Sequence, residues 1–316
     1  MRVAPTNLRY IAAIAGLILI LTSAGWYYVQ RVRHMATEPS DISLAAAAEV
    51  IAKEIQAADA IAFNPGWSAA QRWRFALVWQ KKGFDFNAAY MPAYPIELWD
   101  ADGFSRLWVV STHGYAAQLP ALGKLLKRVE VGHGTDVQLI AIETSSVFDF
   151  RKQLALAKFE QEQPDHTFKL CPWRNDRHSC GGETWADVWQ DFNEVGNSRH
   201  RCIYVQPHKD ASIAKLTWPE TPMADRLQGH FGNRLWAVRH DDGIDLTMKI
   251  KVGEKFLFEK KYPRADSTWL PFDVPLVASD RGKPISFEFS TPSIIWRQAC
   301  FDARLTSAAA VATRAK

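Results

Sequence analysis

The amino-acid sequence predicts a chain of mixed class, in which an amino-terminal transmembrane helix precedes a small α/β domain with a mainly parallel sheet and a carboxyl-terminal β-sandwich. Three observations predict this order. Residues 10–29 form an unbroken apolar stretch, residues 58–145 alternate strand and helix patterns, and residues 200–305 hold short strand patterns between Gly, Pro and Asp turns. The predicted segments are an anchor (1–34), a helical stalk (35–57), the α/β domain (58–145), a connector with a cysteine loop (146–199), the sandwich (200–305) and a disordered tail (306–316).

The predicted anchor has the length of a membrane span. Its twenty residues, at a rise of about 1.5 Å each, would cross the roughly 30 Å hydrocarbon core of a bilayer. A basic start and the small residues 22–24 are also typical of a cleaved secretory signal. We favour retention because the aromatic residues 26–28 continue the stretch as an interfacial belt. The sequence therefore predicts a single-pass protein with a cytoplasmic amino terminus.

Four cysteines, all in the second half of the chain, indicate the compartment of the soluble part. An even number is typical of an oxidising compartment, which places the domains outside the cytoplasm. We expect two disulfides, one across a polar loop and one between the first and last sandwich strands: Cys171 with Cys180, and Cys202 with Cys300. The second would close a loop of almost a hundred residues.

Two patterns offer metal sites as alternatives. His166 and His178 flank the first cysteine pair, but the spacing of the four ligands matches no established zinc pattern. A turn rich in aspartate, with Asp241, Asp242 and Asp245, lacks the D-x-D-x-D-G order of a calcium loop. We expect no metal and no cofactor, and calcium at this turn is left open.

Composition narrows the class of partner. The net charge is +4, and the Lys and Arg residues are scattered among acids, so no nucleic-acid surface is predicted. The predicted partners are the membrane, other subunits of an inner-membrane complex, and a glycan.

Residues 58–145 show three strands with helices between them. The strands cover residues 60–63, 106–110 and 137–142, and the helices cover residues 68–82 and 119–129. This alternation is typical of βαβ units and predicts a mainly parallel sheet.

The segments on either side of this domain are predicted to be helical. The stalk is Ala-rich, and Asp41 can cap its first turn. The connector has an apolar-periodic pattern that predicts a helix over residues 148–159, and the four-residue spacing of Trp185 and Trp189 predicts one packed helix face.

The strand ends of the α/β domain carry candidate site residues. In parallel sheets ligands gather at the carboxyl ends of the strands. Those ends carry Asn64, Trp67, Ser111, His113 and Glu143. Neither a G-x-S-x-G elbow nor a G-x-G-x-x-G loop is present. We favour a structural role for these residues, in which they cap turns and hold the strand ends together. A ligand pocket is the alternative.

The sandwich is predicted from short strands of alternating or β-branched character without helices among them. The expected strands are 202–205, 213–218, 226–231, 235–239, 245–252, 255–262, 269–274, 285–290 and 296–305. A sugar site needs exposed aromatic rings beside planar polar groups. The candidates are His230, Trp236, Arg239, Asp241 and Trp269, with core packing of the two tryptophans as the alternative.

Two parts of the chain resemble known families. Through A-D-A-I-A-F-N-P-G-W and F-S-R-L-W-V-V-S-T-H-G, residues 58–143 resemble the soluble extracytoplasmic segment of bacterial membrane glycosyltransferases of the dolichyl-phosphate-mannose-dependent type. Through R-C-I-Y-V-Q-P-H and M-A-D-R-L-Q-G-H-F-G, residues 200–305 resemble jelly-roll modules of the galactose-binding type. The resemblance implies a bacterial inner-membrane protein with periplasmic domains. The multi-spanning body that holds the family's catalytic carboxylate has no counterpart here, so catalysis is not carried over.

Two functions of different classes follow. The first is a non-catalytic, membrane-anchored accessory subunit that binds a glycan or a neighbouring protein. The alternative is an enzyme that acts on envelope polysaccharide or lipid-linked sugar through the strand-end residues. A glycosidase needs two carboxylates about 5 to 10 Å apart, and Glu143 and Asp100 are the acids that the sequence offers near that site.

Overall fold

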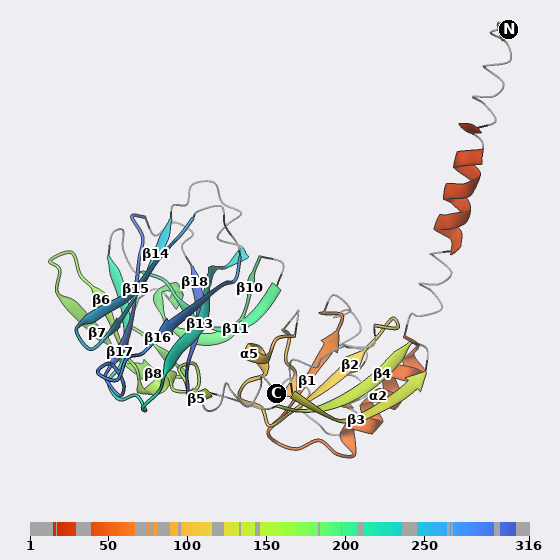
Figure 1. Ribbon diagram of the computed structural model, residues 1–316, viewed down its shortest axis with the longest axis horizontal. Helices are drawn as coiled ribbons and strands as arrows, with labels where there is room; N and C mark the ends of the chain where they lie inside the picture. The colour runs from red at the N-terminus through yellow and green to blue at the C-terminus, as the bar shows by residue number, and fades with distance from the viewer. Residues whose placement is uncertain are drawn as a thin grey trace, which may run out of the picture. The chain divides into compact units, whose positions relative to one another are not determined.

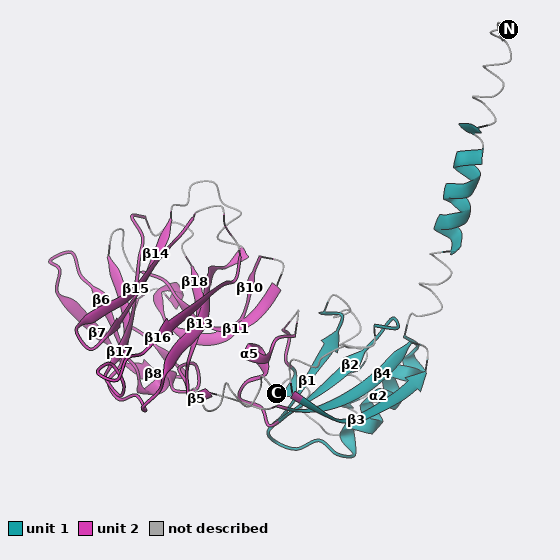
Figure 2. Ribbon diagram, in the orientation of Figure 1, with its two compact units in different colours: residues 1–90, 106–120, 124–141 teal, residues 91–105, 121–123, 142–316 magenta. Residues whose placement is uncertain are grey.

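The fold is taken from a computed structural model of the chain. It describes residues 15–16, 18–29, 39–66, 75, 79–80, 89–93, 96–115, 123–132, 134–142, 146–182, 184–196, 198–207, 212–235, 245–263, 266, 268–293 and 298–307. The chain forms two compact units (Figure 2). Unit 1 comprises residues 1–90, 106–120 and 124–141, and unit 2 comprises residues 91–105, 121–123 and 142–316. Each unit is described by itself.

The predicted transmembrane helix is wrong. Across the residues that the structure describes, no helix is both long and apolar enough to cross a membrane. The predicted single-pass inner-membrane location is corrected by the same finding.

Unit 1 contains a four-stranded sheet of order β1-β2-β4-β3 (Figure 1). The strands are β1 (Asp59–Asn64), β2 (Arg106–Ser111), β3 (Gly123–Gly132) and β4 (Thr135–Ile142). β1 and β2 are parallel, as the sequence predicts, but β2 and β4 are antiparallel. The prediction of a mainly parallel sheet is therefore wrong.

The sheet differs from the prediction because the helix expected over residues 119–129 is the strand β3 in its described part. Gly132 and Gly134 have positive φ, which lets the chain turn back into β4 as a hairpin. The other predicted helix, residues 68–82, lies mostly outside the described residues.

The helix predicted as a stalk packs against the sheet of unit 1. Ser40, rather than Asp41, is the N-cap of α2 (Asp41–Ala52), and its hydroxyl accepts a hydrogen bond from the Ser43 backbone N–H. The apolar face of α2 shares one buried core with strand residues of the sheet: Ala47, Ala48, Ile51, Ile61, Phe63, Trp108 and Val110. This face explains the Ala-rich sequence, since small side chains let a helix lie close to a sheet.

Unit 2 is a sandwich of two sheets, which confirms the predicted β-sandwich (Figure 1). One sheet has the order β10-β11-β18-β13-β16, with β5 also paired to β18, and the other has the order β15-β14-β17-β12-β6-β7. The first contains β5 (Ser146–Asp149), β10 (Trp189–Val195), β11 (Ser198–Val205), β13 (Arg226–Asn233), β16 (Leu270–Pro275) and β18 (Ala299–Thr306). The second contains β6 (Lys158–Glu162), β7 (Phe168–Cys171), β12 (Ile213–Trp218), β14 (Leu246–Val252), β15 (Lys255–Tyr262) and β17 (Ile285–Ser290).

The inner faces of the two sheets enclose one aromatic core. Phe150, Trp218 and Phe287 meet edge to face at 4.9 to 5.8 Å between ring centroids. Such contacts contribute about 0.5 to 1.5 kcal/mol each beyond the buried area. The predicted strand over residues 235–239 lies almost entirely outside the described residues.

The helices predicted in the connector are wrong. Residues 148–159 hold the end of β5, the 3-10 turn Leu154–Leu156 and the start of β6. Trp185 lies in a second 3-10 turn (Thr184–Ala186), while Trp189 begins β10, so the two rings share no helix face. The helical spacing is overridden because β5 pairs with β18 and β6 with β12, and this pairing completes both sheets. A small hairpin, β8 (Trp173–Arg174) with β9 (Arg177–His178), lies beside them.

Both predicted disulfides are present. Cys171 is bonded to Cys180, and Cys202 on β11 is bonded to Cys300 on β18. The zinc alternative falls away because both cysteine sulfurs of that set are bonded. His178 instead lies buried with its ring nitrogens 3.2 and 2.9 Å from the carbonyl oxygens of Cys171 and Leu154.

Candidate functional sites

A cavity of about 200 Å³ lies where β2 ends and β4 begins in unit 1. Ser111 and Asp136 are direct partners in the antiparallel register of β2 and β4, so their side chains share one face of the sheet. Gly114 and Gly134 supply backbone walls. The lining residues are Ser111, Gly114, Arg128, Glu130, Gly134, Thr135 and Asp136, and together they are called the strand-end pocket here.

Two residues that line this pocket each hold a buried oxygen without an internal hydrogen bond in the described part of the chain. Arg128 approaches Asp136 Oδ2 at 2.6 Å and fixes the carboxylate. Asp136 Oδ1 and Ser111 Oγ are buried, and within the described part of the chain neither has a hydrogen-bond partner. Leaving a buried polar atom unsatisfied costs about 1 to 3 kcal/mol. A hydroxyl group in the pocket would recover this energy if either side chain turned towards it.

The other residues predicted at these strand ends play different parts. Asn64 pairs with Ser111 in the parallel register, and its Nδ2 donates a hydrogen bond to the Tyr115 carbonyl at 3.3 Å. His113 adopts a positive φ of 59° in the turn after β2, and its Nδ1 lies 3.0 Å from Thr112 Oγ1. Trp67 and Glu143 lie outside the described residues.

A second cluster lies on the outer face of the β10-β11-β18-β13-β16 sheet in unit 2. Residues 91–105, called the strap here, connect β1 to β2 and belong to unit 2. The strap carries the short helix α5 (Leu98–Ala101). Arg304 on β18 holds the strap, because its Nη1 donates to Asp102 Oδ2 at 2.7 Å and its guanidinium lies 3.4 Å from the centre of the Trp99 ring.

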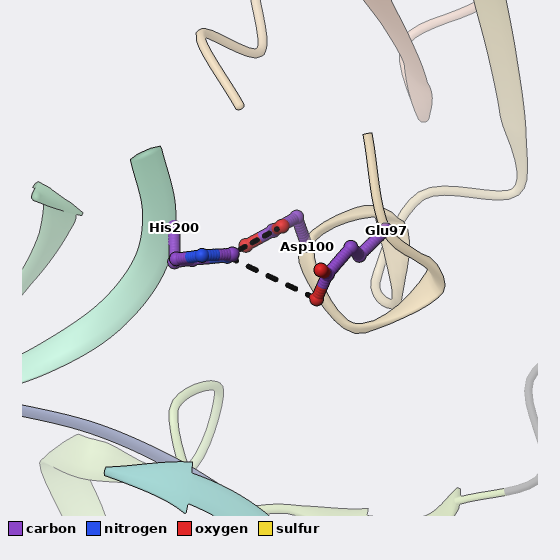
Figure 3. Close-up of side chains that lie close together, drawn as sticks. All are labelled: Glu97, Asp100 and His200. Carbon is purple, nitrogen blue, oxygen red and sulfur yellow. Dashed lines mark hydrogen bonds and ion pairs between the residues drawn. The ribbon is translucent and has the colours of Figure 1, made fainter. Parts of the chain in front are cut away.

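Three ionisable side chains meet where the strap contacts β11: Glu97 and Asp100 from the strap, and His200 from β11 (Figure 3). Asp100 is buried and accepts hydrogen bonds from the Arg201 backbone N–H at 2.7 Å and from His200 Nδ1 at 3.2 Å. Glu97 Oε2 lies 4.0 Å from the same His200 nitrogen. Burial raises the pKa of Glu97 above its ordinary value. Burial lowers the pKa of His200, but the hydrogen bond and charge of Asp100 outweigh it and leave that pKa raised.

The predicted residues His230 and Trp269 border this cluster. Trp269 stacks on His200 and on His230, with ring centroids 4.8 and 5.4 Å away. His230 Nδ1 lies 3.2 Å from Asp302 Oδ1. Among the described residues, neither Trp269 Nε1 nor Asp302 Oδ2 has a hydrogen-bond partner, although both atoms are buried.

Trp236, Arg239 and Asp241, the other predicted sugar-site residues, lie outside the described residues, as does Asp242. The third acid of the possible calcium turn, Asp245, pairs through Oδ2 with Lys261 Nζ at 2.8 Å.

Sequence reasoning missed the residues that complete both clusters. Asp136 was detectable, since it follows the Gly132 and Gly134 turn and faces Ser111 once β3 and β4 are read as a hairpin. His200 was not, because it meets Asp100 across 100 residues of chain.

We predict that Asp302 makes the sandwich sensitive to acid. Burial raises its pKa, but His230, Arg151 and Arg304 outweigh burial and hold that pKa at about 2. An unfolded Asp titrates near pH 3.9, so this stabilisation is present above about pH 4 and is lost as the pH falls towards 2. The expected loss is about 2 to 3 kcal/mol, measured by urea unfolding at pH 5 and pH 2. Asp302→Asn should lose less on acidification than the wild type or the exposed control Asp273→Asn, and an equal loss would contradict the prediction.

Three solved structures to which this chain is similar align with it at TM-scores of 0.29 to 0.32. No protein-family model and no curated protein matches the chain. Among solved structures, a CBM51 module of Clostridium perfringens GH95 in complex with methyl-galactose aligns over 37% of this chain and 81% of its own, at 15% identity and a TM-score of 0.29. Tandem CBM51 modules of a family 98 glycoside hydrolase from Streptococcus pneumoniae align over 54% of each chain, at 8% identity and a TM-score of 0.31. The K3 adhesin domain of Lys-gingipain from Porphyromonas gingivalis aligns over 51% of this chain and 99% of its own, at 13% identity and a TM-score of 0.32.

The class of unit 2 is a β-sandwich, and its own strand order establishes this. The comparison with family models gives no support to the glycosyltransferase resemblance of residues 58–143.

Proposed function

We propose that the chain is a non-catalytic carbohydrate-binding protein and that the strand-end pocket holds one sugar residue. The observation that carries the proposal is that Ser111 and Asp136, which line a cavity of about 200 Å³, each hold a buried oxygen without a hydrogen-bond partner in the described chain.

The chemistry of the pocket suits a polyol. A carboxylate oxygen accepts hydrogen bonds, a serine hydroxyl both donates and accepts, and a guanidinium donates. Asp136, Ser111 and Arg128 thus match neighbouring sugar hydroxyls, each of which is donor and acceptor at once. Two carboxylates, Glu130 and Asp136, disfavour a phosphate or another anion.

The sandwich offers a less suitable stacking surface. Sugar rings bind to open aromatic faces, but Trp269 lies nearly parallel to His200 and His230, at 9° and 13°. Ring stacking on these histidines already occupies Trp269. The polar pocket of unit 1 is therefore the better candidate.

A binding role is favoured over hydrolysis by a serine nucleophile. Such a nucleophile needs a base within hydrogen-bond reach. Ser111 Oγ has no such contact among the residues described, and His113 Nδ1 lies instead against Thr112 Oγ1.

The test is titration calorimetry of the full chain with glucose, galactose, mannose and N-acetylglucosamine. We expect at least one of them to bind, and Asp136→Asn to weaken that binding about 10- to 100-fold, since a hydrogen bond to a charged group contributes about 1.5 to 3 kcal/mol. Ser111→Ala should weaken it by a smaller factor. Asp273→Asn, an exposed acid paired with Arg226 in unit 2, is the matched control and should bind as the wild type does. Failure of all four sugars to bind, unchanged binding in both pocket variants, or cleavage of an oligosaccharide would overturn the proposal.

A further inference from the structure

We propose that Glu97, Asp100 and His200 bind one divalent transition-metal ion, with zinc as the best match, beneath the strap of unit 2. This site is independent of the proposed sugar site, because its residues all belong to the other unit.

The spacing of the three side chains fits a small ion. One ligand atom from each lies within 4.8 Å of the others. Ligands about 2.0 to 2.2 Å from a tetrahedral zinc ion lie roughly 3.3 to 3.6 Å apart. His200 Nδ1 and Asp100 Oδ2 are already 3.2 Å apart, and Glu97 Oε2 is 4.0 Å from the histidine nitrogen. A shift of the Glu97 side chain by about 1 Å therefore closes the site.

The donor set favours zinc over calcium or magnesium. One imidazole nitrogen and two carboxylates are ligands that zinc accepts, whereas calcium and magnesium prefer oxygen alone. Two carboxylates also balance the charge of a divalent ion. Three protein ligands leave the fourth position for water. When the ion binds, the proton shared by Asp100 and His200 passes to solvent.

The surroundings hold two of the ligands in place. Asp100 Oδ1 accepts the Arg201 backbone N–H at 2.7 Å, which fixes the carboxylate while Oδ2 points at His200 (Figure 3). Trp269 stacks on the His200 ring at 4.8 Å and fixes its plane. Neighbours of this kind orient metal ligands. The side chain of Glu97 is 36% exposed, so it is the ligand that can move. An ion can enter the site past this side chain.

A third acid, the buried Asp302, borders the site. Asp302, whose side chain is 1% exposed, interacts electrostatically with both Glu97 and His200. Its Oδ2 has no hydrogen-bond partner in the part of the chain described. Arg151 and Arg304 already balance part of the charge of Asp302, so the two carboxylates that face the ion are those of Glu97 and Asp100.

The experiment is calorimetric titration of the full chain with zinc chloride after treatment with a chelator and its removal. We expect one zinc ion per chain, and a higher melting temperature with zinc than without it. Glu97→Gln should weaken zinc binding at least about 10-fold and abolish the thermal shift, and His200→Gln should act in the same direction. Glu97→Gln is the more informative variant, because the glutamine keeps the shape of a partly exposed side chain and the strap contacts of Asp100 and Asp102.

Two controls separate this site from adventitious zinc. His166→Ala removes the ion pair of the exposed His166 with Glu162. Glu160→Gln replaces an acid on β6 whose side chain is about as exposed as that of Glu97. Both should keep the wild-type affinity. Cobalt(II) bound in place of zinc should show visible absorption bands that Glu97→Gln alters. Two results would overturn the proposal. One is the absence of stoichiometric zinc binding at about 100 μM zinc, which is about 10 times a Kd of 10 μM. The other is equal zinc affinity in the wild type, Glu97→Gln and His200→Gln. Sugar binding tests the proposed function of the strand-end pocket, so either proposal can fail without the other.

Discussion

We expect the double variant Cys202→Ala/Cys300→Ala to lose about 4 kcal/mol of unfolding free energy, because its disulfide closes a loop across almost the whole sandwich. The two cysteines are 98 residues apart in sequence and both are fully buried. The loop-entropy relation gives up to about 4.7 kcal/mol for a loop of this size. The bond also ties β11 to β18 beside Val195 and Trp269, so its loss loosens a packed cluster. Guanidinium unfolding under oxidising conditions measures the change.

The second disulfide provides the matched control. Cys171 and Cys180 are only 9 residues apart, and the same relation gives about 2.7 kcal/mol for that loop. Cys171→Ala/Cys180→Ala should therefore be the more stable of the two double variants. An equal loss in both, or a larger loss from the short loop, would show that loop size does not set the stabilisation.

A similar loss, about 3 to 5 kcal/mol, is expected for Arg151→Met. The side chains of Arg151 and Asp149 are 1% and 3% exposed, and the guanidinium binds both carboxylate oxygens, at 3.1 and 2.9 Å. Its Nη1 also donates to the Arg201 carbonyl at 3.0 Å. Removing the arginine leaves a buried carboxylate without its main partner, and that is the costly state.

A double-mutant cycle isolates this cost. Asp149→Leu/Arg151→Met removes both charges, so it should recover most of the stability that Arg151→Met loses. Urea unfolding of the wild type, the two single variants and the double variant gives the coupling energy. If the double variant were no more stable than Arg151→Met, the loss would come from packing rather than from the unpaired charge.

The sandwich was largely predictable because its strands are defined locally. In β12, β15 and β17 the sequence alternates or is β-branched, and turns with Gly, Pro or Asp bound each strand, so the predicted limits match those observed. The strands of the sandwich that precede residue 200 carried no such signal. β5 and β6 are short and separated by a 3-10 turn. They are strands because β5 pairs with residues 304–306 of β18, which β11 leaves unpaired, and β6 pairs with β12.

The sheet of unit 1 shows how a locally ambiguous pattern misleads. K-L-L-K-R-V-E-V fits a helix by its apolar spacing, but the glycines after it provide the positive φ that a hairpin requires. Weighing the turn above the periodicity would have predicted β3 and the antiparallel half of the sheet.

The candidate sites were predictable only in part. Ser111 stands out as a polar residue at a strand end, and His230 and Trp269 stand out as aromatic residues in the sandwich, whereas their neighbours in space do not. Ser111 meets Asp136 through the β2 and β4 register, and His200 meets Asp100 only after the strap has bound the sheet. Sequence patterns identify residues with suitable chemistry, but the partners depend on tertiary pairing.

The strap also sets the order in which the protein can complete its fold during synthesis. A ribosome delivers residues 91–105 before the strands that they cover, since Asp102 precedes its partner Arg304 by 202 residues. At about 5 to 20 residues per second, that interval lasts about 10 to 40 s. β1 and β2 can pair meanwhile, but the strap cannot yet form its contacts with Arg201 and Arg304. Because β18 comes last among the described strands and lies between β11 and β13, this sheet closes when β18 pairs with strands that were made earlier on either side of it.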